Sequence, residues 1–422
     1  MGYIPDDIKM LTELFVKSDR EIYMVGGCVR DMLMGKEPSD FDLATSAFPE
    51  ETKKILKDFT VLETGLKHGT VTVRINGASY EITTYRIESG YSDKRHPDSV
   101  DFTRNLSEDL SRRDFTINAM AMDCSGNVID YFGGRDDIEK RIIRTVGNPD
   151  DRFREDALRI LRAVRFSAKL GFETEEATAR SIFSNKGLLK DISRERIFTE
   201  ISKTVTAEFA PETIREFYPV IFEAIYGSKN LGSKDLDGTL REKFAEVSEF
   251  FREIHGRAEG AEIRFAALFK IIGEEDAKAT LRSLKVSNDF SRAVTEIISC
   301  SDEFEEAHGD RDEVLVDVLV RYGEDCVTKA ALLSDFCKNG KLTEVAEKDI
   351  TLAEELKKKR CLSLKELAVC GADIQATGLG GRDIGDALKA VLREVSHGRL
   401  ENEKEEILDF VGNNIKKQQI DN

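Results

Sequence analysis

The clearest alternation of hydrophobic and polar residues lies in TVTVRINGASYEITTYR, residues 70–86. Hydrophobic residues occupy every second position from 71 to 75, and Asn76-Gly77, a favoured two-residue hairpin turn, follows them directly. The pattern therefore predicts two antiparallel strands joined by a tight turn. Successive side chains of a strand point to opposite faces, so Glu81 in the second strand shares its face with polar neighbours.

From about Asp151 onward the hydrophobic spacing changes to three and four residues, which is the period of an amphipathic helix. Two segments show it best, TLREKFAEVSEFFREIHG (239–256) and DIGDALKAVLREV (383–395). Their hydrophobic stripes consist of Leu240, Phe244, Val247, Phe251 and Ile254 in the first, and Ile384, Leu388, Val391 and Val395 in the second. Such stripes normally pack into a core. We therefore expect a first third that mixes strands and helices, followed by helices over the rest of the chain.

The 422 residues suffice for several domains, and their composition excludes several kinds of site. Seven cysteines are scattered without a CxxC pair, and five histidines lack ligand spacing, which argues against a disulfide framework or a transition-metal centre. The apolar runs are short and interrupted by charge, and MGYIPDDIKM at the N-terminus lacks the features of a secretory signal. We therefore expect no membrane association and a cytoplasmic location.

The charge pattern differs between the whole chain and one segment. The net charge of −17 argues against a nonspecific polyanion binder. Residues 140–169, however, carry nine Lys or Arg residues against four Asp or Glu residues. This local excess predicts a positive surface inside an acidic protein.

Two aspartates one residue apart, Asp40 and Asp42, follow a glycine pair in VGGCVRDMLMGKEPSDFDLAT, residues 25–45. On a strand their carboxylates share one face and repel each other unless a cation lies between them. Mg²⁺ suits this position, since it binds through one or two carboxylates together with substrate phosphates. The glycine pair lets backbone amides approach phosphate oxygens, and Arg30 is a suitable phosphate donor. Glu81 is a candidate third carboxylate; the alternative is a turn or solvated strand edge for the aspartates and an ordinary solvated position for Glu81.

Two arginine-rich segments follow the predicted hairpin. In SRRDFTINAMAMD, residues 111–123, Arg113 and Asp114 precede an apolar stretch, and Asp114 can cap a helix formed by FTINAMAM. The alternative for this segment is a capped helix with solvated arginines.

The second segment, RFREDALRILRAVRF (152–166), predicts a helix with a row of charges on one side. The charges at intervals of three are Asp156, Arg159, Arg162 and Arg165. One interpretation is a salt-bridged surface, because Glu155 and Arg159 have i,i+4 spacing. The other is base reading. A carboxylate that accepts beside an Arg that donates complements the exocyclic amine and ring acceptor of cytosine or adenine, whereas uracil and guanine present the reverse pattern.

Several long motifs, in this order, resemble the successive signatures of class II tRNA nucleotidyltransferases, the bacterial CCA-adding enzymes. They are GGCVRDMLMGKEPSDFDLAT, GLKHGTVTV, YRIESGYSDKRHPD, EDLSRRDFTINAMAMD, DYFGGRDDIEKRIIRTVGNPDDRFREDALRILRAVRF and LRSLKVSN. The dense similarity covers residues 20–175, and GGRDIGDALKAVLREVSHGRLENEKEEIL also resembles the tail of that family.

The resemblance implies an α+β fold, with a DNA polymerase β-like nucleotidyltransferase head (a mixed sheet with helices) followed by an all-α neck, body and tail. The expected divisions are residues 1–147 for the catalytic head, 148–208 for the neck, 209–310 for the body and 311–422 for the tRNA-binding tail. The implied activity is addition of C, C and A to the 3′ end of tRNA from CTP and ATP, with release of pyrophosphate. The implied partner is the acceptor arm and 3′ end of tRNA.

The resemblance also implies roles for individual residues. Asp40 and Asp42 would be the Mg²⁺ ligands, with Glu81 as a further catalytic carboxylate. The residues expected to bind the nucleotide are Gly27, Arg30, Arg113, Asp114, Asp156, Arg159, Arg162 and Arg165. Among these, Asp156 and Arg159 would serve as the protein template that reads the incoming base.

Two further observations bear on the exact activity. The position where some relatives carry the His-Asp pair of a phosphohydrolase reads Phe269-Lys270, so no such hydrolase activity is expected. A loop that CC-adding relatives lack is present as IESGYSDKRHPDSV, with Tyr91, Asp93, Arg95 and His96, which favours complete CCA addition. The alternatives are an A-adding enzyme acting on tRNA ending in CC, a poly(A) polymerase, and a noncatalytic RNA-binding scaffold.

Overall fold

The computed structural model describes residues 3–62, 65, 69–89, 99–227, 234–273, 276–307 and 310–420. By their contacts the residues group into two compact units, 1–236 and 237–422. Among the described residues no helix is both long and apolar enough to cross a membrane.

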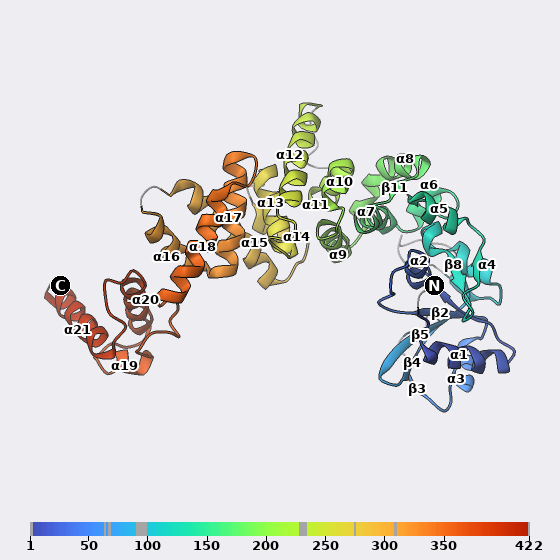
Figure 1. Cartoon of the computed structure of the whole chain (residues 1–422), viewed down its shortest axis with the longest axis horizontal. Coiled ribbons are helices and arrows are strands. Elements are labelled where there is room, and N and C mark those ends of the chain that lie inside the picture. The colour runs from blue at the N-terminus through green and yellow to red at the C-terminus, as the bar shows by residue number, and fades with distance from the viewer. Residues whose placement is uncertain are drawn as a thin grey trace. The chain divides into compact units, whose positions relative to one another are not determined.

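A seven-stranded sheet forms the centre of the first unit, with the strand order β3-β4-β5-β2-β1-β8-β9 (Figure 1). The strands are β1 (Ile22–Val25), β2 (Asp42–Thr45), β3 (Thr60–Leu62), β4 (Thr70–Ile75), β5 (Ala78–Thr84), β8 (Met120–Met122) and β9 (Val128–Asp130). β2 and β5 are parallel, and the other neighbouring pairs are antiparallel. The sheet is therefore mixed, as the family resemblance implied.

The predicted hairpin is confirmed as β4 and β5. Asn76 and Gly77 both have positive φ, 49° and 87°, which a two-residue turn between twisted strands requires. Tyr80 and Ile82 are buried, whereas Glu81 is exposed on the opposite face. The parallel register places Glu81 directly beside Asp42 of β2.

Helices cover both faces of this sheet. α1 (Asp6–Lys17) buries Ile8, Leu11 and Phe15 in a core shared with β1 and β4, and α2 (Gly27–Leu33) joins the same core. The opposite face packs against α4 (Leu106–Ser111). The remaining elements of this region are α3 (Pro49–Ile55), α5 (Gly134–Lys140) and a separate two-stranded hairpin of β6 (Arg86–Ser89) and β7 (Ser99–Phe102).

The prediction of a helix for FTINAMAM is wrong. Thr116–Asn118 form a short 3-10 turn, and the following residues form β8 between β1 and β9. All three residues of β8 are buried, because this strand lies inside the sheet. A strand covered on both faces shows no alternation, so its apolar run cannot be distinguished from a helix by period alone.

The helical part of the first unit begins at α6 (Pro149–Glu155), where Asn148 caps the helix by accepting hydrogen bonds from Asp150 N–H and Asp151 N–H. It continues through α7 (Leu158–Leu170), α8 (Glu176–Asn185), α9 (Arg194–Val205), α10 (Ala210–Glu216) and α11 (Tyr218–Tyr226), with a 3-10 segment at Lys186–Asp191. A short parallel pair, β10 (Ile142–Ile143) with β11 (Glu173–Thr174), ties the end of α7 to the residues that precede α6.

The single helix predicted across residues 152–166 is divided in two. Asp156 has an extended conformation (φ −143°, ψ 105°) and separates α6 from α7. Its carboxylate Oδ1 accepts a hydrogen bond from Leu158 N–H, 3.0 Å away. Asp stabilises such a break because its short side chain offers the first turn of the next helix an acceptor.

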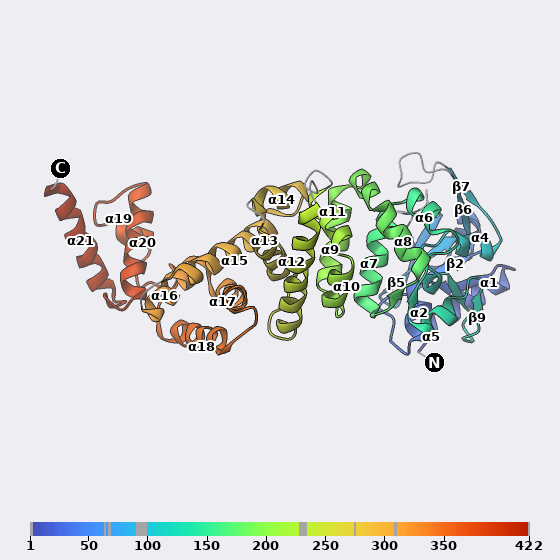
Figure 2. The same ribbon diagram turned by 90° about the horizontal axis from the view of Figure 1, so that it is seen from above.

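The second unit is helical throughout its described residues. Its helices are α12 (Lys234–Glu253), which begins just before the boundary, α13 (Ala261–Ile272), α14 (Ala277–Ser283), α15 (Asn288–Glu306), α16 (Arg311–Tyr322), α17 (Glu324–Asn339), α18 (Glu344–Lys359), α19 (Gly371–Gln375), α20 (Arg382–Ser396) and α21 (Lys404–Ile420). α15, α17 and α18 pack in sequence, and α19, α20 and α21 form a further group (Figure 2). The predicted stripe of α12 is buried throughout, and in α20 Val391 and Val395 are buried.

Candidate active site

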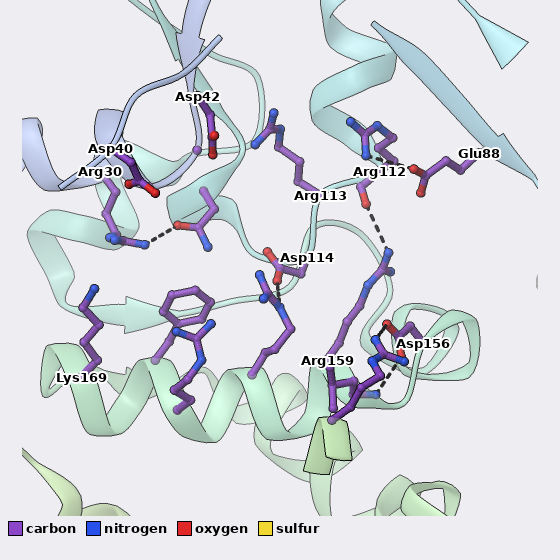
Figure 3. A pocket seen from close by; sticks show the side chains of 18 of the residues that line it. Arg30, Asp40, Asp42, Glu88, Arg112, Arg113, Asp114, Asp156, Arg159 and Lys169 are labelled. Carbon is purple, nitrogen blue, oxygen red and sulfur yellow. Dashed lines mark hydrogen bonds and ion pairs between the residues drawn. The ribbon is translucent and has the colours of Figure 1, made fainter. Parts of the chain in front are cut away.

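A cavity of about 790 Å³ opens between the sheet and helix α7, within the first unit. This volume is in the range of small-molecule sites. Asp40 and Asp42 lie at one end, Asp156 and Arg159 at the other, and Asp114 lies between them (Figure 3). Cationic side chains outnumber acidic ones along the wall, so the cavity is the positive surface expected from the charge excess in residues 140–169.

The carboxylate end of the cavity is formed where β2 begins. Burial raises the pKa of Asp42, and the nearby charges of Asp40 and Glu81 raise it further against the opposing effect of Arg113. The two aspartates therefore repel each other, and a bound cation would relieve that repulsion. Glu81 is not among the residues that line the cavity, although it lies beside Asp42 in the sheet.

The oxygen donors suit a hard divalent ion that also binds substrate phosphates. No group of three or more His, Cys, Asp or Glu side chains within the described ranges is arranged to hold a metal by itself. Two carboxylates with open coordination positions fit an ion that takes its remaining ligands from water and phosphate.

The glycine pair has a steric role that the sequence did not reveal. Gly26 has φ 77° and ψ −130°, a conformation open almost only to glycine. A Cβ at this position would lie 2.9 Å from Nη1 of Arg113, so the absent side chain also makes room for that guanidinium. Gly27 opens α2 at the wall of the cavity.

Arg30 and Arg113, two of the arginines expected to bind the nucleotide, differ in how many of their N–H groups the protein already occupies. Arg30 is only 3% exposed, and it donates to Asp31 Oδ1 (2.8 Å from Nε) and Asn118 Oδ1 (2.7 Å from Nη1). Its guanidinium also lies over the ring of Phe166, 5.4 Å from the centroid. Arg113 is held less tightly, by an ion pair between its Nη2 and Asp109 Oδ2 at 3.5 Å. Its Nε is buried without a hydrogen-bond partner among the described residues.

Asp114 joins the sheet side of the cavity to α7. Its Oδ2 accepts a hydrogen bond from Nε of Arg162 at 2.6 Å, and its Oδ1 accepts one from Phe115 N–H. Burial of Asp114 opposes ionisation, but the charges of Arg162 and Arg159 and the hydrogen bonds outweigh it and lower its pKa. Asp114 therefore orients α7 and does not cap the helix expected after it.

The two residues predicted to read the base both line the cavity, but they are not paired with each other. Oδ2 of Asp156 accepts a hydrogen bond from Nη2 of Arg196 on α9 at 2.7 Å. Arg159 forms an ion pair with Glu155, and its Nη2 donates to the carbonyl of Arg112 at 3.3 Å. The i,i+4 salt bridge expected from the sequence is therefore present, and Arg159 as a whole residue is only 9% exposed.

The next arginine, Arg165, is held on both sides. Its Nε donates to Glu200 Oε2 at 2.6 Å, and its guanidinium lies 4.3 Å from the centroid of Phe166. The ring of Phe166 thus contacts guanidinium groups of arginines from both α2 and α7. The ring orders their guanidinium groups along one side of the cavity.

Sequence reasoning missed several residues of the wall: Arg86, Glu88, Lys169 and Arg196. Arg112 stands in the segment SRRDFTINAMAMD, but the sequence suggested no role for it. Its Nη1 donates to Glu88 Oε1 at 3.0 Å, and its backbone carbonyl accepts a hydrogen bond from Arg159. Arg196 lies 40 residues from Asp156, and no local pattern links them. Lys169 continues the charged side of α7 by one turn and could have been found from that spacing. The loop residues Tyr91, Asp93, Arg95 and His96 lie outside the described residues.

Family models match three parts of the chain. Residues 22–144 match the Poly A polymerase head domain, residues 171–218 match the probable RNA and SrmB-binding site of polymerase A, and residues 258–411 match a putative tRNA nucleotidyltransferase domain 2. A curated CCA-adding enzyme of Bacillus velezensis is 36% identical over 403 residues, which cover 94% of this chain and 95% of the relative. The chain belongs to the family of CCA-adding enzymes.

Further relatives agree with this assignment. A CCA-adding enzyme of Streptococcus suis is 37% identical over 395 residues, covering 93% of this chain and 92% of the relative. The crystal structure of the Bacillus stearothermophilus CCA-adding enzyme in complex with CTP superimposes with a TM-score of 0.79 at 32% identity, covering 98% of each chain. A tRNA nucleotidyltransferase complexed with a primer tRNA and an incoming ATP analog gives a TM-score of 0.62 at 27% identity, covering 83% of this chain and 99% of that one.

The family and fold resemblance seen in the sequence is thereby confirmed. CCA-adding enzymes generally use a divalent metal ion, which agrees with the donor set at Asp40 and Asp42. The four-part division at residues 147, 208 and 310 stays a prediction. Contacts divide the chain once, after Leu236, so the predicted head and neck belong to one compact unit.

Proposed function

We propose that the protein adds C, C and A to the 3′ end of tRNA, using CTP and ATP, releasing pyrophosphate and requiring no nucleic-acid template. The observation that carries this proposal is the cavity that brings a carboxylate pair, several arginines and the Asp156/Arg159 pair within the reach of one nucleotide. Relatives that match nearly the whole chain are curated as CCA-adding enzymes, which supports the same conclusion.

For the chemical step, we assign Asp40 and Asp42 as ligands of Mg²⁺. When bound, the ion stabilises negative charge on the α-phosphate and the departing pyrophosphate and lowers the pKa of the attacking 3′-hydroxyl. The two aspartates fix the position at which the hydroxyl and the α-phosphate meet. Glu81 acts from the neighbouring strand as a further acidic group, through its charge beside Asp42.

The phosphates are bound by groups on both sides of the cavity. Gly27 contributes backbone at the start of α2, and Arg113 contributes a guanidinium with an unused Nε donor. Arg30 is largely occupied by Asp31 and Asn118, so it supplies mainly charge together with its remaining N–H groups. The other nucleotide-binding residues in this assignment are Asp114, which orients Arg162, and Arg162 and Arg165 on α7.

We assign base selection to Asp156 and Arg159. An ionised Asp accepts from the exocyclic amine of cytosine or adenine, and the Arg donates to the adjacent ring nitrogen. Uracil and guanine offer an acceptor where Asp156 requires a donor, which leaves polar groups unpaired and costs affinity. Arg159 has five N–H donors, and its bonds to Glu155 and to the carbonyls of Arg152 and Arg112 use at most three of them, which leaves donors for the base.

The acceptor arm and 3′ end of tRNA are the proposed macromolecular partner, bound through phosphates and shape, and the proposed location is the cytoplasm. Three substrates test the activity: tRNA ending before CCA, tRNA ending in CC, and an unrelated RNA, each incubated with CTP, ATP or both. Complete CCA on the first substrate is the expected result. If A is added to the tRNA ending in CC and nothing is added to the tRNA ending before CCA, the protein is an A-adding enzyme. Extension of the unrelated RNA would identify a poly(A) polymerase.

A further inference from the structure

Lys169 lines the nucleotide cavity from the last turn of α7. It follows Arg162 by seven residues, which is close to two full turns, so the two side chains leave the helix in nearly the same direction. Arg162 reaches Asp114 on the sheet side of the cavity. Lys169 therefore faces the cavity as well, about 10 Å further along the helix axis and away from the base-reading end.

Two arginines identify the part of the cavity that Lys169 faces. The ring centroid of Phe166, one turn earlier on α7, lies 5.4 Å from the guanidinium carbon of Arg30 and 4.3 Å from that of Arg165. Residues three apart on a helix are neighbours on its surface, so Lys169 lies beside this group. Its side chain points from α7 toward Arg30 and Asp40, at the end of the cavity that contains the carboxylate pair (Figure 3).

The charge of Lys169 is not balanced in the way that its neighbours on α7 are. Each arginine of this helix forms an ion pair: Arg159 with Glu155, Arg162 with Asp114, and Arg165 with Glu200. Lys169 is exposed and has no ion pair or hydrogen bond among the described residues. Its positive charge lies near two arginines, and binding of an anion there would relieve the repulsion between them.

The terminal phosphates of the incoming nucleotide are the anion that fits this place. In the proposed function the base lies at Asp156 and Arg159 and the α-phosphate lies at the carboxylate pair, so the β- and γ-phosphates extend away from Arg159. Lys169 is the cation of α7 farthest from Arg159, about 15 Å along the helix axis. An ammonium on a flexible stem is a mobile point charge that suits a departing phosphate, whereas each paired arginine is held in one place.

We propose that Lys169 binds the β- and γ-phosphates of CTP or ATP and holds the pyrophosphate that they become. In that step the 3′ oxygen of tRNA bonds to the α-phosphorus, pyrophosphate leaves with the electron pair of the broken bond, and the hydroxyl proton is released to solvent. This inference rests on the proposed function of the same cavity. Because Lys169 contacts phosphates alone, it contributes equally to the use of CTP and ATP and takes no part in choosing the base.

The test compares Lys169→Met and Lys169→Arg with the unaltered full-length protein. The KM for CTP and for tRNA is measured on tRNA ending before CCA, the KM for ATP on tRNA ending in CC, and inhibition constants are measured for CMP, CDP and inorganic pyrophosphate. For Lys169→Met we expect the KM for both nucleotides and the inhibition constants of CDP and pyrophosphate to rise by about 5- to 20-fold, because a hydrogen bond between charged groups is lost at a site open to water. The inhibition constant of CMP and the KM for tRNA should be unchanged, and Lys169→Arg should retain most of the affinity because it keeps the charge.

Lys203→Met is the matched control. Lys203 is also an exposed lysine in the last turn of its helix, the neighbouring α9, but it does not line the cavity. A lysine in the last turn interacts favourably with the helix dipole, so both Met variants should have a slightly lower melting temperature. Nucleotide and pyrophosphate binding should change in Lys169→Met only.

Unchanged constants for CTP and pyrophosphate in Lys169→Met would overturn the inference. A higher KM for tRNA alone would place Lys169 on the phosphates of the tRNA and overturn it as well, as would an equal rise for CMP and CDP. If Lys169→Met does not fold, Lys169→Gln decides by the same constants. Failure of the unaltered protein to add C and A would overturn the proposed function instead, and equilibrium titration of CTP into the unaltered protein and the variant would still test Lys169.

Discussion

The substitution Gly26→Ala tests two roles of this glycine: it adopts an unusual backbone conformation, and it leaves space for the side chain of Arg113. Gly26 adopts φ 77° and ψ −130°, and forcing alanine into this region costs about 1–3 kcal/mol. For a unit of this size, that loss corresponds to a fall in melting temperature of about 2–12 °C. The new Cβ would also lie 2.9 Å from Nη1 of Arg113, so the guanidinium must move.

The displacement of Arg113 gives a second, independent effect. If Arg113 donates to the triphosphate, loss of a hydrogen bond between charged groups costs about 1.5–3 kcal/mol, or about 10- to 100-fold in kcat/KM for CTP. The assay combines thermal unfolding with steady-state CTP incorporation into tRNA ending before CCA. The KM for tRNA should change much less than kcat/KM for CTP.

Gly77→Ala is the control for backbone strain. Gly77 has φ 87° in the turn between β4 and β5, and a Cβ there would have no neighbouring atom within 4 Å. It should lower stability by about 1–2 kcal/mol and leave nucleotide kinetics unchanged. Normal kcat/KM for CTP in Gly26→Ala, with the expected loss of stability, would refute the placement of Arg113 against the nucleotide.

Three further changes test other parts of the structure. Asp42→Asn should abolish nucleotide addition while tRNA binding, measured by filter retention, stays near normal; turnover at the unaltered rate would exclude Asp42 as a metal ligand. Asp156→Asn replaces one acceptor by a donor, so the ratio of CTP to UTP incorporation should fall by about tenfold or more, and an unchanged ratio would contradict base reading by this residue. Hydrogen bonds from Arg20, Phe48 N–H and Arg104 lower the pKa of Glu51 to about 2. Its contribution to folding is therefore complete above the ordinary pKa near 4.5 and disappears as the pH falls toward 2. The stability difference between the unaltered protein and Glu51→Gln, followed by urea unfolding from pH 6 to 2.5, should shrink with acid, and a constant difference would be inconsistent with that pKa.

What the sequence predicts well depends on short-range patterns. The hairpin of β4 and β5 follows from alternation and an Asn-Gly turn, and the stripe of α12 follows from its spacing. Both signals arise from burial of one face, which the order of residues records directly. The candidate site residues were found in the same way, as motifs.

The errors and omissions share a different cause, which is long-range contact. β8 becomes a strand because β1 and β9 lie beside it, and nothing within its own residues specifies those neighbours. Asp156 breaks the helix because its carboxylate bonds to Leu158 N–H and to Arg196. The space that Gly26 leaves for Arg113 depends on residues 87 positions apart in the chain.

The contacts between the sheet side and α7 determine where this protein can be cut. Arg162 neutralises buried Asp114, Phe166 supports Arg30, and Arg159 bonds to the carbonyl of Arg112. A fragment that ended at residue 147 would retain the carboxylate pair but would lose Arg162, which pairs with Asp114, and Phe166, which contacts Arg30. A usable catalytic fragment should therefore include α7, and the division after Leu236, where the contacts separate the chain into two units, is a rational end for it.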